Sequence, residues 1–139
     1  MAKRACRPDI AMQRVLERIT YVEDEPDIRE IAQIALQTLG GFNLDVCCCG
    51  QEAIEKSPGF DPDLILLDVM MPEMDGVETF QKIRANPKLR GTPIIFMTAK
   101  AQPHEVQQYL DLGAAGIIAK PFDPIGLADQ VRAIWDKQN

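Results

Sequence analysis

Short apolar runs alternate with stretches of helical periodicity along this chain. Five runs are rich in Val, Ile, Leu and Phe, a composition typical of buried strands. They lie at residues 19–22, 42–47, 64–67, 94–97 and 116–119. The segments that follow them have apolar residues at the three- and four-residue spacing of amphipathic helices. We therefore predict helices at 28–39, 51–56, from 75 onward, 103–112 and from 123 onward.

Capping residues mark where several of these helices begin and end. Glycines at 40–41 stop the first helix, and Gly113 stops the fourth. Asp75 is the expected N-cap of the third helix. Asp123 is that of the last, with Pro124 at its first helical position. The faces expected to be buried contain Ile28, Ile31, Ala32, Ala35 and Leu39 in the first helix, and Leu127, Val131 and Ile134 in the last.

The order of these elements predicts the fold class. Strand and helix alternate five times with short connections, which is typical of an α/β protein whose parallel sheet is covered by helices on both faces. The chain has 139 residues, enough for one domain with a hydrophobic core. We place this domain at residues 15–139. Residues 1–14 are expected to form a flexible or lightly docked N-terminal extension.

Charge and hydropathy restrict the partners of this domain. The chain has 15 basic and 21 acidic residues, and its net charge of −6 argues against a basic nucleic-acid-binding surface. No apolar run is as long as a membrane span, and the N-terminal residues lack the apolar segment of a secretory signal. We expect a cytoplasmic protein that binds neither nucleic acid directly nor a membrane.

The four cysteines do not have the spacing of a metal site. Cys47, Cys48 and Cys49 are consecutive, and the fourth, Cys6, lies in the N-terminal extension. Successive strand residues point to opposite faces of a sheet, so adjacent cysteines on a strand cannot easily pair. We expect reduced thiols that pack in the interior.

Polar residues stand where four of the predicted strands end. Glu23 and Asp24 follow the first strand, Asp68 the third, Thr98 the fourth and Lys120 the fifth. The carboxyl ends of parallel strands lie at one edge of the sheet, where ligands bind in this class of fold. We therefore predict that three carboxylates, a hydroxyl and an ammonium group converge there.

Such a cluster needs cations. Three neighbouring carboxylates repel one another, and Lys120 compensates only one of the charges. Oxygen ligands without nearby His or Cys favour a hard ion, and Mg²⁺ would neutralise the remaining charge. A metal ion, an amine and a hydroxyl around one carboxylate suit phosphoryl transfer, in which the carboxylate itself can be the nucleophile. Asp68, alone at the end of the most apolar strand, is the best candidate.

At these residues the sequence resembles the receiver domain of bacterial two-component response regulators. The motifs are YVEDE, LILLDVMMPEMDG, FMTAKA, DLGAAG and AKPFDP, in order and at the spacing of the family, over residues 18–137. The resemblance is closest in kind to single-domain, chemotaxis-type regulators. It implies a flavodoxin-like (βα)5 fold, a doubly wound sheet of five parallel strands in the order 2-1-3-4-5.

The resemblance also implies roles for the acidic residues. Asp68 would be the phosphoacceptor, so the protein would be a phosphoprotein carrying an aspartyl phosphate. Asp68 and Asp24 would bind Mg²⁺ directly, and Glu23 would act through a water molecule. The main-chain carbonyl of Met70 would be a further ligand of the metal ion.

Three more positions follow from the resemblance. Lys120 would bind a phosphoryl oxygen, and its peptide bond to Pro121 is expected to be cis. Thr98 would turn its hydroxyl toward the phosphoryl group. At Ile117, three residues before the lysine, the sequence departs from the family, which has Tyr or Phe at this switch position. A branched aliphatic side chain cannot make the rotation that the aromatic ring makes. Glu23 replaces the commoner Asp, a milder change.

The expected function is that of a signalling domain and not of an enzyme acting on other substrates. A sensor histidine kinase or histidine phosphotransfer protein would donate the phosphoryl group in two-component or phosphorelay signalling. Phosphorylation would change contacts with a downstream protein, with homodimerisation as a further possible result. If the chain is complete, it must act through protein contacts or as a relay intermediate, because no output domain is visible.

Two alternatives remain open. One is an Asp-nucleophile phosphatase of the haloacid-dehalogenase type, which wants a second acid two residues after the nucleophile, where this chain has Met70. The other is a pseudo-receiver that binds partners without being phosphorylated. Only Ile117 points toward it, since the acceptor, the acidic pair and the lysine are all present.

Overall fold

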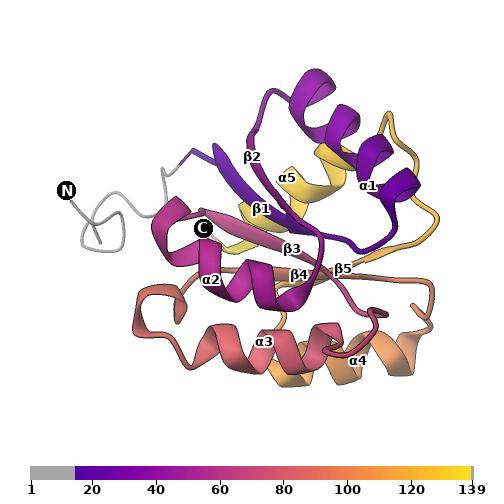
Figure 1. Cartoon of the computed structure of the whole chain (residues 1–139). Helices are drawn as coiled ribbons and strands as arrows, with labels where there is room; N and C mark the ends of the chain where they lie inside the picture. Colours follow the sequence, from indigo (N-terminus) through magenta and orange to yellow (C-terminus); the bar gives the residue numbers. More distant parts are fainter. Residues whose placement is uncertain (1–14, 139) are drawn as a thin grey trace.

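The computed structural model describes residues 15–138, which form five strands and helices on both sides of them (Figure 1). The predicted extension at residues 1–14 lies outside the described part of the chain. The strands are β1 (Arg18–Val22), β2 (Asn43–Cys47), β3 (Leu64–Asp68), β4 (Ile94–Thr98) and β5 (Gly116–Ala119). The helices are α1 (Pro26–Gln33), its π-helical continuation η3 (Ile34–Leu39), α2 (Gly50–Phe60), α3 (Gly76–Arg84), the short 3₁₀ helix η4 (Pro87–Leu89), α4 (Pro103–Leu112) and α5 (Leu127–Gln138).

The sheet has the predicted topology. All neighbouring strands are parallel, and their order is β2-β1-β3-β4-β5. The order reverses at β1, so α1 and α5 cover one face while α2, α3 and α4 cover the other (Figure 1). The predicted α/β fold class is confirmed.

The central strand β3 is buried on both faces, which accounts for its unbroken apolar run. Leu64 and Leu66 pack with the α1/α5 layer, whereas Ile65 and Leu67 pack with the α2–α4 layer. All four side chains are fully buried. Burying each one contributes roughly 2 kcal/mol, and together they hold the end of β3 in a fixed place. Asp68, the last residue of β3, is therefore held by a rigid element.

The predicted start of the last helix was wrong. Residues 124–126 form a turn, and α5 begins at Leu127. The Asp123 carboxylate accepts a hydrogen bond from the Ile125 N–H at 3.1 Å, and the Asp123 carbonyl accepts one from the Gly126 N–H at 3.0 Å. Asp123 thus closes a separate turn with the two to three residues that follow it. The sequence of this turn resembles that of a helix start. Leu127 and Val131 are buried as expected.

The buried face of the first helix was predicted only in part. Ala32 and Ala35 are buried, but Ile31 is 45% exposed and Leu39 is 60% exposed, while Leu36 is fully buried. The wider π-helical turn from residue 34 onward rotates the later side chains away from the positions of a regular α-helix. Leu39, in this segment, therefore stays at the surface, whereas Ile31 precedes the segment and is exposed on α1 itself.

Two further expectations need correction. Helix α2 extends to Phe60 and not to residue 56, since the Asp61 N–H donates to the Ser57 carbonyl at 2.9 Å and closes a last turn beyond Pro58. Within residues 15–138 the three cysteines are free thiols as expected, but Cys47 alone among them is packed in the interior; Cys6 lies outside the described residues. Cys48 and Cys49 are exposed because β2 ends at Cys47 and they belong to the following loop.

Within residues 15–138, no helix combines the length and the apolar character that crossing a membrane requires.

Candidate functional site

The polar residues at the strand ends converge as predicted. Glu23 and Asp24 directly follow β1, and Asp68 ends the neighbouring strand β3. One oxygen from each of these three carboxylates lies within 4.8 Å of the others. Lys120 directly follows β5 and reaches the same place from the other side of β4. Parallel pairing brings these residues to one edge, although up to 97 positions separate them in the chain.

Lys120 forms an ion pair with two of the carboxylates. Its Nζ atom lies 2.9 Å from Asp68 Oδ1 and 3.1 Å from Glu23 Oε1, and its side chain is only 14% exposed. The Lys120 N–H donates to the Thr98 carbonyl at 2.9 Å, which fixes the start of the loop after β5. The Lys120–Pro121 peptide bond is cis, as the resemblance implied. Burial by itself lowers the pKa of Lys120, but the bonds and charges of Asp68 and Glu23 outweigh it and leave this pKa raised.

The carboxyl group of Asp68 has a raised pKa. Asp68 is 1% exposed, and burial raises this pKa to about 6. The hydrogen bond from Lys120 opposes this shift, whereas the negative charges of Glu23 and Asp24 add to it. Asp68 Oδ1 is bound to Lys120, but Oδ2 is buried without a hydrogen-bond partner. One oxygen of the predicted acceptor is therefore free for another ligand.

Glu23 and Asp24 differ in their surroundings. Glu23 is fully buried; its Oε1 atom accepts bonds from Lys120 and from the Tyr21 hydroxyl at 3.4 Å, and its Oε2 atom accepts one from the Glu25 N–H at 3.3 Å. Asp24 Oδ1, in contrast, is buried without a partner. Both oxygens of Glu23 are thus satisfied within the protein, whereas Asp24 keeps one for a cation.

The donor set fits a hard divalent ion. Asp24 and Asp68 each have a buried oxygen that lacks a partner, a costly arrangement unless a ligand compensates it. The groups close to these two oxygens are carboxylates and one ammonium, with no sulfur or imidazole ligand in the cluster. Such an oxygen-only set selects Mg²⁺ or a similar ion. These two residues are the ones that would hold it.

The loop after β3 is fixed by a close approach at Gly76. A Cβ atom at Gly76 would lie 2.4 Å from the Asp68 carbonyl oxygen. The Gly76 N–H donates to the Val69 carbonyl at 2.8 Å, and Asp75 caps α3 by accepting from the Glu78 N–H at 2.9 Å. Sequence reasoning identified the Asp75 cap but missed the steric need for glycine. The only signal was the glycine that directly follows that cap.

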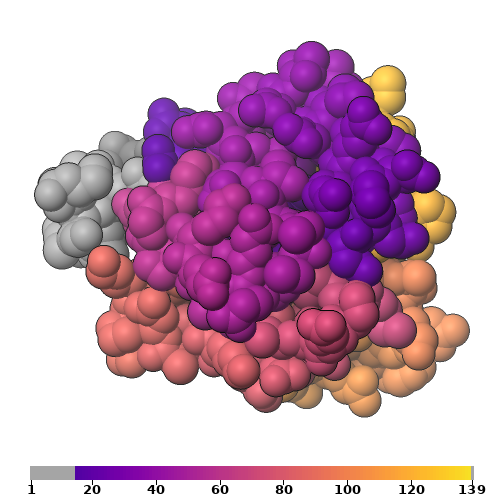
Figure 2. All heavy atoms as spheres, in the orientation of Figure 1, coloured from indigo at the N-terminus to yellow at the C-terminus, as the bar shows by residue number. Residues whose placement is uncertain are grey.

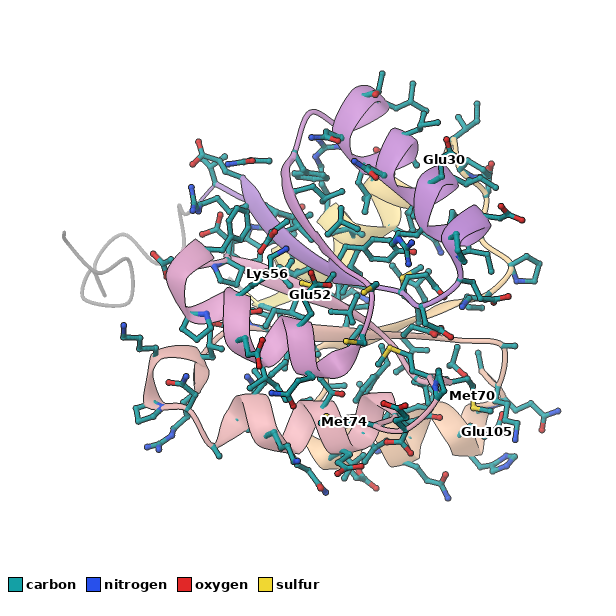
Figure 3. The ribbon with its side chains drawn as sticks, in the orientation of Figure 1. Glu30, Glu52, Lys56, Met70, Met74 and Glu105 are labelled. Atoms are coloured by element: carbon teal, nitrogen blue, oxygen red, sulfur yellow. The ribbon has the colours of Figure 1, made fainter. Side chains whose placement is uncertain are left out.

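The remaining predicted positions lie around this cluster. Thr98 ends β4 and is buried; its hydroxyl accepts a hydrogen bond from the Lys100 N–H at 3.0 Å. Met70 lies in the β3–α3 loop with an exposed side chain (Figure 3). The role of its carbonyl stays a prediction, as do the roles assigned to the other residues.

Ile117 packs on the α3/α4 side of the sheet. It pairs with Phe96 of β4 and joins an apolar cluster that contains the rings of Phe80, Phe96 and Tyr109. The Phe96 and Tyr109 ring centroids are 5.1 Å apart, and those of Phe80 and Phe96 are 5.5 Å apart. The aromatic side chains in the cluster around the switch position therefore come from α3, β4 and α4 and not from β5. Sequence reasoning missed Tyr109 because nothing in a helical pattern shows which strand residue it meets.

An apolar cavity of about 340 Å³ lies beside Lys120. Its walls come from Ile28 and Ile31 of α1 and from Phe122 and Pro124 of the loop after β5. The half-exposed Ile31, which sequence analysis placed in the core, thus borders the site.

Fold and site together define a flavodoxin-like α/β domain with an acidic, lysine-paired cluster at the carboxyl edge of its sheet. A family profile described as the response regulator receiver domain matches residues 19–132. The chain belongs to this family, as the sequence motifs predicted. It is a signalling domain of two-component systems.

Individual proteins similar to this chain are response regulators as well. The chain is 37% identical over 123 residues to the response regulator ArlR of Staphylococcus aureus, an alignment that covers 88% of this chain and 54% of that protein. It is 33% identical over 120 residues to the response regulator Rre1 of Synechocystis, covering 86% and 52%. The chain therefore spans about half the length of these curated relatives. The crystallised chemotaxis response regulator CheY4 of Vibrio cholerae superposes with a TM-score of 0.79 at 29% identity, covering 86% of this chain and 99% of that one.

Proposed function

We propose that this domain accepts a phosphoryl group from a phosphohistidine donor onto Asp68, with Mg²⁺ bound by Asp24 and Asp68. The observation that carries the proposal is the contrast between the two oxygens of Asp68. Lys120 holds Oδ1 at 2.9 Å, while Oδ2 is buried without a partner beside the equally unpartnered Asp24 Oδ1. A cation and a phosphoryl group would complete these contacts.

The transfer itself requires little covalent chemistry from the protein. The P–N bond of the donor breaks, its electron pair stays on the imidazole nitrogen, and a new P–O bond forms to Asp68. The carboxyl group must be ionised to attack, and its pKa of about 6 leaves most of it ionised at pH 7. A bound Mg²⁺ ion supplies charge neutralisation at the phosphoryl oxygens.

Other residues of the site position these groups. Lys120 would move from the Asp68 carboxylate to a phosphoryl oxygen, since its ammonium group has three donors and a flexible stem. Glu23 keeps Lys120 oriented through the 3.1 Å contact and would reach the metal ion through water. The Met70 carbonyl would complete the metal ligands. The Thr98 hydroxyl accepts from Lys100 and still has its own hydrogen to donate to a phosphoryl oxygen.

The partners are inferred from this chemistry. A sensor histidine kinase or a histidine phosphotransfer protein would supply the phosphoryl group. The apolar cavity between α1 and the loop after β5 offers such a donor a contact surface beside Lys120. The phosphorylated domain would then act on a downstream protein, with homodimerisation as one form of that contact, in the cytoplasm.

The phosphatase alternative has less support. The residue two positions after Asp68 is Met70, whose exposed thioether cannot protonate a leaving group. The pseudo-receiver alternative requires a defective site, whereas the acceptor, both acids and the lysine are present and lie close together.

Phosphotransfer tests the proposal directly. We expect the purified chain with Mg²⁺ and a small phosphodonor, such as acetyl phosphate or phosphoramidate, to gain one phosphoryl group, measured by intact-protein mass spectrometry. Asp68→Asn should abolish this gain, and Glu30→Gln, an exposed acid on α1, should not. Labelling of Asp68→Asn to the level of the unsubstituted chain would reject Asp68 as the acceptor.

A further inference from the structure

Tyr21 brings a hydroxyl group from the hydrophobic core to the acidic cluster. It is a residue of β1, it is fully buried, and it belongs to the apolar layer between the sheet and helices α1 and α5, together with Leu66 and Met97. Figure 2 shows the atoms of α1, β2 and α2 closing this side of the molecule over the middle of the sheet. A hydroxyl group in such surroundings needs a partner within the protein.

The partner of this hydroxyl is Glu23, two positions further along the chain. The Tyr21 hydroxyl donates to Glu23 Oε1 at 3.4 Å, and the Glu23 side chain is itself fully buried. Burial, followed by the charges of Glu23 and Asp68, raises the pKa of Tyr21, so the phenol keeps its proton at neutral pH. A carboxylate has no hydrogen to give, and therefore the phenol is the donor of this bond.

The same oxygen of Glu23 binds the lysine of the site. Glu23 Oε1 lies 3.1 Å from the Nζ atom of Lys120, which in turn lies 2.9 Å from Asp68 Oδ1. Tyr21, Glu23, Lys120 and Asp68 thus form one continuous chain of polar contacts. It leads from the interior of the α1/α5 layer to the proposed acceptor.

The rest of Glu23 is held as well. Its Oε2 atom accepts from the Glu25 N–H at 3.3 Å, its N–H donates to the Cys47 carbonyl at 3.1 Å, and its carbonyl accepts from the Arg29 guanidinium at 2.8 Å. These contacts fix the backbone and one oxygen of Glu23. The position of the other oxygen, Oε1, depends on Tyr21 and Lys120.

We propose that Tyr21 is a positioning residue of the phosphorylation site, which acts through Glu23 to hold the Lys120 ammonium group beside Asp68. This inference rests on the function proposed above, in which Lys120 binds a phosphoryl oxygen. Without the Tyr21 hydroxyl, a buried carboxylate oxygen loses a donor and turns toward other ones. The ammonium group that shares this oxygen then loses its fixed place.

Two variants isolate the hydroxyl group. Tyr21→Phe keeps the ring in the core and removes the bond to Glu23. Tyr109→Phe removes the hydroxyl of the only other tyrosine in the chain, whose ring contacts Phe96 away from the cluster, and is the matched control. Urea denaturation identifies conditions in which both variants are fully folded, so that a loss of stability alone does not enter the comparison.

The reactivity of the Lys120 amine tests the contact chain without phosphorylation. Limited reductive methylation of the chain in EDTA, followed by peptide mass spectrometry, compares Lys120 with the exposed Lys137 of α5. Lys120 is only 14% exposed and should react slowly in the unsubstituted chain. We expect Tyr21→Phe to raise its relative rate about threefold or more, and Tyr109→Phe to leave it unchanged. Equal rates in Tyr21→Phe and the unsubstituted chain would overturn the proposal.

Phosphorylation by acetyl phosphate then tests the consequence for the site. At saturating Mg²⁺, we expect Tyr21→Phe to lower the maximal rate about three- to tenfold. The Mg²⁺ concentration that gives half of this rate should not change, because Asp24 and Asp68 are the proposed metal ligands. A change in the half-saturating Mg²⁺ concentration with an unchanged maximal rate would contradict a role through Lys120.

A double substitution shows whether Tyr21 acts through Glu23. Glu23→Gln keeps the shape of the side chain but removes the ion pair with Lys120, so adding Tyr21→Phe should lower the maximal rate little further. A further loss as large as that of Tyr21→Phe alone would overturn the proposed route. If the unsubstituted chain is not phosphorylated at all, the proposed function fails, whereas the methylation rates still decide whether Tyr21 holds Lys120.

Discussion

The Nζ atom of Lys120 lies 2.9 Å from Oδ1 of Asp68, although 52 positions separate the two residues in the chain. This contact couples the fifth strand to the third. It also places the ammonium group of Lys120 beside a carboxyl group whose pKa is raised by burial. The ionisation of Asp68 and the stability of the domain should therefore depend on each other.

Asp68 should destabilise the folded domain at neutral pH. Its pKa is raised from 3.8 to about 6, so the folded state binds the proton more tightly than the unfolded state does. The contribution of Asp68 to the free energy of unfolding should therefore fall as the pH rises from about 4 to about 6 and stay level above that. The full shift corresponds to roughly 3 kcal/mol, an upper value because Lys120 and the neighbouring carboxylates respond to the same change of charge.

Asp68→Asn checks this linkage without metal ions. We expect the substituted domain to be more stable than the unsubstituted one at pH 7 by about 1–2 kcal/mol, and the difference to vanish near pH 4. Urea denaturation at both pH values, in the presence of EDTA, measures it. An equal difference at the two pH values would show that the effect does not come from ionisation of this carboxyl group.

Mg²⁺ should stabilise the domain through Asp24. A ligand that binds only the folded state adds about 2.7 kcal/mol at one hundred times its dissociation constant. We expect Mg²⁺ to raise the midpoint temperature of thermal unfolding of the unsubstituted chain. This shift should be lost in Asp24→Asn, because the buried oxygen of residue 24 is then no longer anionic. Glu30→Gln, an exposed acid on α1 outside the cluster, should keep the whole shift and serves as the control.

Gly76→Ala should disturb the backbone that carries the acceptor. The added Cβ atom would lie 2.4 Å from the Asp68 carbonyl oxygen, closer than any stable contact, so the β3–α3 loop must move. We expect a loss of about 2 kcal/mol or more in stability and slower phosphorylation of Asp68.

Gly59→Ala is the matched control, because a Cβ atom at this position in α2 meets nothing within 4 Å. It should be neutral or stabilise the domain by about 0.5–1 kcal/mol. Urea denaturation and the rate of labelling by acetyl phosphate measure both variants. Equal behaviour of the two would mean that the β3–α3 loop tolerates a side chain at Gly76.

Tyr109 should stabilise the α4 side of the sheet through its ring. Its centroid lies 5.1 Å from that of Phe96, in the cluster that also holds Ile117. Tyr109→Ala removes this contact and should cost about 2–3 kcal/mol, less than a fully buried aromatic residue, because the side chain is half-buried. Tyr109→Phe keeps the ring and should cost under about 1 kcal/mol. If urea denaturation gave the two variants the same stability, the phenol hydroxyl and not the ring would carry the effect.

Some features of the site were accessible from sequence because they depend on local order. The apolar run at 64–67 predicted a buried strand, and Asp68 at its end predicted a polar group at the sheet edge. Parallel topology then brought Glu23, Asp24 and Lys120 to the same edge, since strand ends must meet there. The strand order was inferred from the family motifs, because the alternation of strands and helices alone does not determine it.

Other features were not accessible because they depend on contacts between distant segments. Asp123 has the sequence signature of a helix cap, but its hydrogen bonds close a turn and α5 starts later. The exposure of Leu39 follows from a π-helical segment, and no periodic pattern distinguishes such a segment from an α-helix.

Apolar periodicity and motif spacing were enough to predict the class of fold, the family and the residues that gather at the carboxyl edge of the sheet. They report which segments must be buried and which strand ends must be polar. The packed structure was needed to see which oxygens of those residues are already bound, that Tyr109 meets Phe96, and that Cys48 and Cys49 are exposed. Hydrogen bonding and exposure depend on the distances between atoms from separate elements, and those distances are fixed only when the helices pack on the sheet.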